Sequence, residues 1–330
     1  MAGKDSKGGV FGLDYSRRYD QNCYLCAHNA YAARSYGWCY YQQTSGVFKQ
    51  LQAGVRALML DVWIKGEEVF LCHEGFKKTQ IMKPFSQPTK LSSLFLEVRQ
   101  FLDSNPREVV TCFFESYVNN RDVMHRAFKE GNVEDIIFWQ DSEENDVCSK
   151  GWPTLQDMVD KNKRLVLFSD NRDDGIPYEW RYCTQNVYGS AGTSSTTWMD
   201  ARSKNYPLTC PNTLFVLNHF PSVAVNVFEM LTRVMAKINS KDKIINHARA
   251  CREACKAANA QCDRIPNFVA IDLIDRGKTG GGPAAVEEIN RWWAEATGGD
   301  KVEQQSVNTE PAVVTEGGAD TSEAPAVAQS

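Results

Sequence analysis

The sequence contains no apolar run of the roughly 18 residues that a membrane-spanning helix needs. Its apolar stretches, such as 214–217 and 223–230, are short or interrupted by polar residues. The first 20 residues also lack the apolar segment of a secretory leader. We therefore expect no transmembrane segment, and any contact with a membrane should be peripheral.

An excess of positive charge is also missing. The chain carries 37 Lys and Arg residues against 41 Asp and Glu residues. Residues 301–330 hold one Lys and five of the acidic residues, so subtraction leaves 36 against 36 for the rest. A neutral body with an acidic tail has no basic field that gathers nucleic acid, so this class of partner is not expected.

Cysteine, by contrast, is abundant, with 11 residues. This count suits an oxidising compartment, so localisation is open between a secreted or cell-surface protein whose leader is absent and a cytoplasmic protein. Cys23 and Cys26 form a CxxC motif, but the chain lacks the second, matching motif of a typical zinc site. We expect these cysteines to be structural thiols or to form bridges.

Composition divides the chain into three parts. Residues 298–330 have no aromatic residue and are rich in Glu, Thr, Ala, Pro and Gly, which predicts a disordered acidic tail. Residues 1–20 are read as an N-terminal extension. Residues 21–297 contain no comparable linker and no internal repeat, which favours one domain with a large core.

Apolar and β-branched runs alternate with helical stretches in this domain. The predicted strands are Cys23–Ala27, Arg56–Val62, Glu68–Cys72, Val109–Glu115, Leu165–Ser169, Leu214–Asn218 and Phe268–Leu273. The predicted helices are Ser45–Gln52, Leu91–Ser104, Leu155–Lys161, Ser240–Ala260 and Ala284–Ala296. This alternation predicts a (β/α)8-type TIM barrel, and the absence of GxGxxG after the first strand argues against a dinucleotide-binding sheet.

Polar residues stand at the carboxyl ends of these strands, where barrel enzymes carry their functional groups. They are His28, Asn29, Asp61, His73, Glu74, Glu115, Asp170, Asn218, His219, Asp272 and Asp275. A pair of histidines can take a proton from an attacking hydroxyl and give one to a departing oxygen, as phosphodiester cleavage requires. His219 is as compatible with a packed core position as with substrate contact, and His125 and His247, in polar helical stretches, are expected at the surface.

Several runs of the sequence resemble one known family. They are AHNAY, GVRALMLDVW, FLCHEG, NPREVVTCFFESYV, WPTLQDMV, NKRLVLFSD, LFVLNHF and PNFVAIDLIDRG. These runs resemble, in order, the X-domain of phosphatidylinositol-specific phospholipase C, and above all the single-domain phospholipase-C-like phosphodiesterases. The resemblance covers about residues 21–290. It implies a distorted or incompletely closed barrel and a phosphoinositide-like lipid or soluble phosphodiester as substrate.

The resemblance also implies roles for individual residues. His28 and His73 match the two catalytic histidines: His28 would activate the attacking hydroxyl, and His73 would protonate the leaving oxygen. Asp272 or Asp275 would orient His28. Asn29, Asp61 and Glu115 match metal-binding positions and are hard oxygen donors of the kind that Ca²⁺ or Mg²⁺ prefers.

One position departs from the family pattern. Met59 stands where calcium-dependent members carry a glutamate, and a thioether is no ligand for a hard cation. The metal-free bacterial members use an arginine at the position that Asp61 occupies here. The alternatives left open are a glycerophosphodiesterase- or sphingomyelinase-like enzyme on the same barrel, and a phospho-ligand-binding barrel without turnover.

Overall fold

The computed structural model describes residues 9–85, 87–188, 193–196, 213–221, 234–258 and 263–298. Residues 1–298 form one compact unit. The predicted tail lies almost wholly outside the described residues. Within them, no helix combines the length and the apolar character that crossing a membrane requires.

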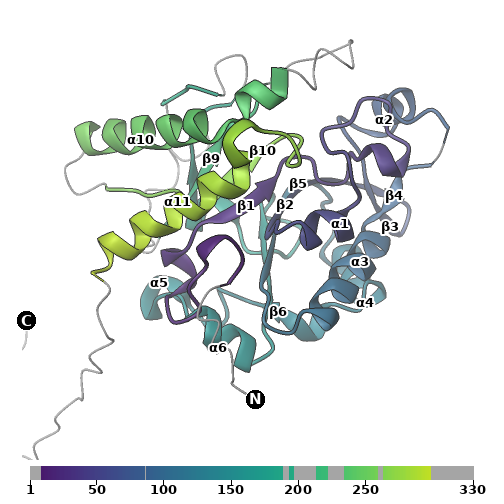
Figure 1. The fold of residues 1–330 in the computed structure, drawn as a ribbon. Coiled ribbons are helices and arrows are strands. Elements are labelled where there is room, and N and C mark those ends of the chain that lie inside the picture. Colours follow the sequence, from purple (N-terminus) through teal and green to yellow (C-terminus); the bar gives the residue numbers. More distant parts are fainter. Residues whose placement is uncertain are drawn as a thin grey trace, which may run out of the picture. The chain divides into compact units, whose positions relative to one another are not determined.

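One ten-stranded sheet organises the described part of the unit (Figure 1). Its strands are β1 (Tyr24–Ala27), β2 (Ala57–Lys65), β3 (Glu68–Leu71), β4 (Thr89–Lys90), β5 (Val110–Tyr117), β6 (Ile137–Phe138), β7 (Leu165–Ser169), β8 (Cys183–Gln185), β9 (Leu214–Asn218) and β10 (Phe268–Ile271). The main path runs β6-β7-β5-β2-β1-β10-β9-β8, and every pair along it is parallel. The carboxyl ends of these strands therefore share one rim.

The inner face of the sheet forms a core of its own. Successive side chains of a strand point to opposite faces, so alternate residues from each strand meet in one layer. This layer is built from Tyr24, Cys26, Ala57, Phe113, Val166, Phe168, Cys183, Leu214, Val216, Phe268 and Ala270. Strands from both ends of the path contribute to it, and the rings of Phe168 and Tyr182 lie 5.9 Å apart. The sheet is thus curled into a distorted (β/α)8 barrel, which confirms the predicted fold class.

A second core separates the sheet from the helices around it. The helices are α1 (Val47–Gln52), α2 (Phe76–Met82), α3 (Leu91–Ser104), α4 (Arg121–Glu130), α5 (Val147–Lys150), α6 (Leu155–Asp160), α7 (Glu179–Tyr182), α10 (Lys241–Ala258) and α11 (Gly281–Ala296). In α3 the buried residues recur every three or four positions and so form one apolar face. A Cβ on Gly282 would lie 2.6 Å from Ile271 and 2.9 Å from Leu25, so glycine lets α11 pack closely on β1 and β10.

The segment before β1 packs against the barrel. Its residues include two short 3-10 helices, Val10–Gly12 and Tyr19–Gln21. The buried Asn290 side chain of α11 donates to the carbonyls of Phe11 and Cys23 and accepts from the Cys23 N–H. The described part of the predicted extension therefore belongs to the same compact unit.

One predicted barrel strand was placed incorrectly. The segment Glu68–Leu71 is not a parallel strand of the barrel: as β3 it runs antiparallel to β2 and also pairs with β4. β2 continues past Asp61 to Lys65, turns at Gly66, whose φ is +62°, and returns as β3. Apolar content alone cannot distinguish such a return strand from a barrel strand. β5, predicted as the fourth strand, is therefore the direct parallel neighbour of β2.

Candidate active site

Strand periodicity brings six of the predicted polar residues to one face of one rim. Each of the six follows an inner-face residue of its strand by two positions and therefore points in the same direction. The residues placed in this way are His28, Asp61, Glu115, Asp170, Asn218 and Asp272. They mark the carboxyl-end mouth of the barrel.

His28 is held by the backbone, by a carboxylate and by an aromatic ring. The backbone N–H of His28 donates to the Ile271 carbonyl oxygen at 3.1 Å. Its Nδ1 lies 2.7 Å from Asp272 Oδ1, and because a carboxylate only accepts, Nδ1 is the protonated nitrogen. The ring of Phe220 is stacked on the imidazole at 3.6 Å with an interplanar angle of 4°. The histidine side chain remains 21% exposed, so Nε2 is the nitrogen left for substrate.

The structure also decides between the two predicted partners of His28. Asp272 is 9% exposed and contacts the imidazole. Asp275 instead accepts from the Thr44 hydroxyl at 3.1 Å. Of the two aspartates, only Asp272 is placed to orient His28.

His73 reaches the mouth through the return of β3. The backbone N–H of His73 donates to Thr79 Oγ1 of α2 at 2.8 Å. Its ring atom Nδ1 lies 3.2 Å from Asp61 Oδ2. The hydrogen bond to Asp61 raises the pKa of His73 above its ordinary value of 6.5, while burial opposes this shift. The side chain is 23% exposed. The site thus contains two imidazoles, each bonded through Nδ1 to a buried aspartate.

Acidic and aromatic groups stand beside this pair. Asp61 and Glu115 are direct partners in the β2–β5 register. The Tyr117 hydroxyl donates to Glu115 at 2.6 Å, and the Trp63 ring stacks on Tyr117 at 4.0 Å. The bond to Glu115 raises the pKa of Tyr117, with further contributions from burial and from the charges of Glu115, Asp61 and Asp170. The carboxylates of Asp61, Glu115 and Asp170 therefore lie near enough to the Tyr117 hydroxyl to raise its pKa together.

Two of the predicted metal donors have hydrogen-bond partners within the mouth. One oxygen of Asp61 is engaged by His73, and one of Glu115 by Tyr117. Asn29 is buried with a φ of +44°, and Met59 contributes only a thioether. In the part of the chain that the structure describes, no group of three His, Cys, Asp or Glu residues is arranged to hold a metal ion.

His219 and His247 lie apart from these dyads. His219 is fully buried; its Nε2 donates to the Ile238 carbonyl at 3.1 Å, and its Nδ1 lies 2.9 Å from Nδ1 of His247. The prediction of a surface position for His247 was wrong: this side chain is 4% exposed and lies on the inward face of α10 with the buried Ile244, Ala248 and Cys251. Cys23 and Cys26 are free, buried thiols in the outer and inner cores respectively, so they do not face one common metal ion.

Burial of His219 makes the stability of the fold sensitive to acid. It lowers the pKa of His219 from 6.5 to about 4, so the unfolded chain binds the proton more readily between these values. The contribution of His219 to the free energy of unfolding should therefore be constant above pH 6.5. It should fall by about 3 kcal/mol as the pH drops to 4. Urea unfolding across this range tests the sign. His219→Gln should lack this part of the pH dependence, and an unchanged pH slope would contradict the assignment.

Sequence reasoning missed the aromatic residues of the mouth. Trp63, Tyr117 and Phe220 each lie two residues beyond a predicted strand-end group, namely Asp61, Glu115 and Asn218. Continuing the two-residue alternation past each strand end would have identified them.

Comparisons with known proteins agree with this architecture. The family model PI-PLC X 1 matches residues 15–285. A PI-PLC X domain-containing protein of Arabidopsis thaliana is 28% identical over 76% of this chain and 56% of its own length. PI-PLC X domain-containing protein 1 of Arthroderma benhamiae is 24% identical over 79% of this chain and 83% of its own length. The chain thus spans little more than half of the plant relative.

Solved structures show the same fold at low identity. A phosphatidylinositol-specific phospholipase C of Staphylococcus aureus is 12% identical, with a TM-score of 0.51 over 84% of this chain and 94% of that chain. The phosphatidylinositol-specific phospholipase C of Listeria monocytogenes is 13% identical, with a TM-score of 0.51 over 86% and 97%. These likenesses concern the barrel and not its chemistry.

Proposed function

The chain belongs to the PI-PLC X family, and from this premise we propose that it is a phosphoric diester hydrolase or lyase that works by acid and base catalysis with two histidines. The observation that carries the proposal is the pair of dyads, His28 with Asp272 and His73 with Asp61. Both Nδ1 atoms are committed to carboxylates. Nε2 of His28 is therefore left to exchange a proton with substrate. Nε2 of His73 lies 3.6 Å from the exposed Glu74 carboxylate, beyond hydrogen-bond length, and is the nitrogen that can give a proton to the leaving oxygen.

The two dyads suit the two proton transfers of one displacement at phosphorus, one as base and the other as acid. Nε2 of His28 takes the proton of the attacking hydroxyl, whose oxygen forms a bond to phosphorus. The bond from phosphorus to the leaving oxygen breaks, and that oxygen takes a proton from Nε2 of His73. The raised pKa of His73 favours the protonated form that this step needs. Asp61 and Asp272 orient the two rings through hydrogen bonds to their Nδ1 atoms.

A hydroxyl next to the phosphodiester, as in phosphatidylinositol, would serve as the nucleophile and give a cyclic product. Water would serve in a second, slower step that opens the ring. The test is turnover of phosphatidylinositol and of a soluble phosphodiester, with cyclic and acyclic inositol phosphates measured separately in calcium, magnesium and chelator. We expect the cyclic product first. Binding of phosphodiester with no product would instead support a barrel that binds without turnover.

We also propose that catalysis has little dependence on calcium or magnesium. Asn29, Asp61 and Glu115 are the donors that would hold the ion, and a bound ion would supply charge neutralisation at the phosphate. With Met59 in place of a carboxylate, they bind it weakly at best. The histidine dyads carry the proton transfers without it.

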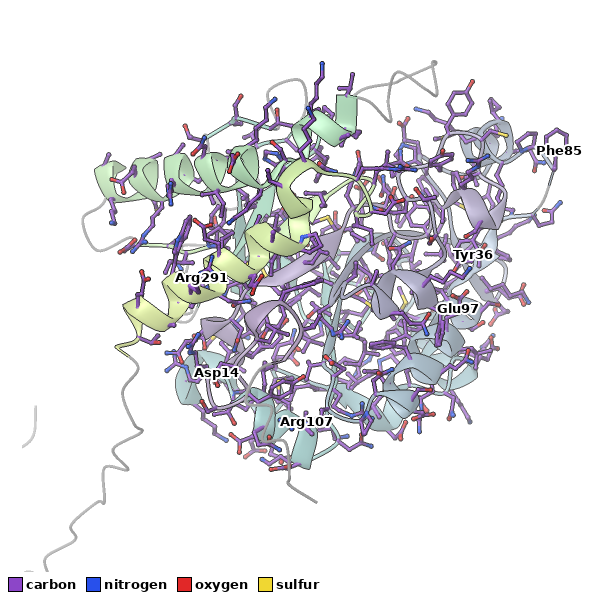
Figure 2. All side chains as sticks on the ribbon, in the orientation of Figure 1. Asp14, Tyr36, Phe85, Glu97, Arg107 and Arg291 are labelled. Carbon is purple, nitrogen blue, oxygen red and sulfur yellow. The ribbon has the colours of Figure 1, made fainter. Side chains whose placement is uncertain are left out.

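A lipid bilayer is the proposed source of the substrate. α2 follows His73 directly and exposes Lys77 and Ile81, which lie one turn apart on the same face. Ile81 is 71% exposed, and Phe85 beyond the helix is 91% exposed and projects at the periphery in Figure 2. Apolar side chains beside a lysine fit the interface of an anionic membrane.

Vesicle sedimentation tests this docking surface. The variant Ile81→Ser with Phe85→Ser should bind about tenfold less for each side chain to phosphatidylcholine vesicles containing phosphatidylserine. Leu96→Ser on α3, which removes a side chain 51% exposed, is the matched control and should bind like the native chain. Equal binding by the double variant, or a dimer that only the double variant loses, would contradict a lipid partner.

A further inference from the structure

We infer that Phe220 is a positioning residue for His28, which fixes the plane of the imidazole so that Nε2 meets the attacking hydroxyl. The inference deepens the proposed function. It starts from the ring contact: the two rings are 3.6 Å apart, almost parallel at 4°, and Phe220 is only 3% exposed. A contact of this closeness covers one whole face of the histidine.

The place of Phe220 is set by the residue before it. The His219 N–H donates to the Ala270 carbonyl at 2.9 Å, and its buried ring is bonded to the Ile238 carbonyl and to His247. His219 is therefore anchored on the outer side of the sheet. Alternation then turns Asn218 and Phe220 to the inner side, so the Phe220 ring cannot swing away without loosening the buried histidine.

Asp272 and Phe220 restrict different motions of the His28 ring: the carboxylate fixes the position of Nδ1, and the aromatic ring fixes the tilt of the imidazole plane. The 2.7 Å bond to Asp272 holds the position of Nδ1, but a single hydrogen bond still allows the imidazole plane to tilt about it. The parallel Phe220 ring limits that tilt and excludes water from one face.

Kinetics distinguish this role from substrate binding. Phe220→Leu keeps apolar volume but loses the flat face, and we expect kcat to fall about 10- to 10²-fold with KM little changed. Phe220→Tyr keeps the ring and should restore most of the rate. A higher KM with unchanged kcat would show that Phe220 contacts substrate, and would overturn the inference.

Proton NMR tests the same contact without any turnover, so its result is independent of the proposed reaction. The chain has five histidines, so single substitutions assign the His28 ring protons. In the native chain, the Phe220 ring current should move these protons upfield. Phe220→Leu should abolish the shift and Phe220→Tyr should retain it.

The matched control is Tyr188→Leu, since Tyr188 contacts Phe220 with ring centres 5.6 Å apart. This variant should leave the His28 signals upfield. An unshifted His28 signal in the native chain, which needs no variant to fold, would overturn the inference, and so would an upfield signal that survives in Phe220→Leu.

Discussion

The variant His28→Ala is expected to cleave phosphatidylinositol or a soluble phosphodiester about 10²- to 10⁴-fold more slowly than the native chain, measured as kcat. The imidazole is the group whose free Nε2 takes the proton of the nucleophile, and alanine leaves Asp272 with no ring to orient. The substitution leaves the other side chains of the mouth in place. The loss should therefore appear in kcat more than in KM.

The companion variants sharpen this result. His73→Ala should cost no more than His28→Ala, because Met59 leaves no glutamate at its position to share the role of base with His28. Asp272→Asn should lose less, since the imidazole itself stays in the site and only its orienting contact is altered. His125→Ala is the matched control, because this histidine stacks on Trp139 away from both dyads. Activity of His28→Ala and His73→Ala equal to that of the control would sink the two-histidine mechanism.

The variant Met59→Glu is expected to gain calcium binding, from a Kd in the millimolar range or weaker to one in the micromolar range. Met59 lies two residues before Asp61 on the inner face of β2, and its direct partner on β5 is Phe113, two residues before Glu115. A glutamate there would add a third carboxylate to Asp61 and Glu115. Ligand charge is the main determinant of calcium affinity at such sites.

Calorimetry with calcium and activity in calcium or chelator measure this gain. Met59→Gln is the matched control, because it has the same length as glutamate but no charge, and it should bind calcium as weakly as the native chain. Micromolar calcium affinity in the native chain, with activity lost in chelator, would show that the existing donors suffice. Weak binding by Met59→Glu would show that the three carboxylates do not converge.

Much of the candidate site could be predicted from the sequence, because in a parallel barrel every residue at the carboxyl end of a strand lies on the same rim. A buried strand is recognisable from its apolar residues, and its end is recognisable from the polar residue that follows. His28, Asp61 and Glu115 were identified in this way, and the structure brings them to one mouth. The family resemblance added roles for these residues.

The predictions that were wrong share a physical cause. The return of β3 beside β2 depends on pairing between segments, and the apolar run Glu68–Leu71 reads the same in either direction. His247 stands in a polar helical stretch, and only the packing of α10 shows that its side chain lies on the buried face, next to His219. Neither the pairing of β3 nor the burial of His247 can be read from the local sequence pattern.

The sequence by itself determined the barrel, its inner and outer faces and the set of strand-end groups, because periodicity and strand length are local properties. The tertiary structure alone decided the partners: Asp272 rather than Asp275 for His28, Asp61 for His73, and the ring of Phe220 over the first histidine. These pairings join residues as far as 244 positions apart. Such contacts form only when the sheet curls, since distance along a chain says nothing of distance across a barrel.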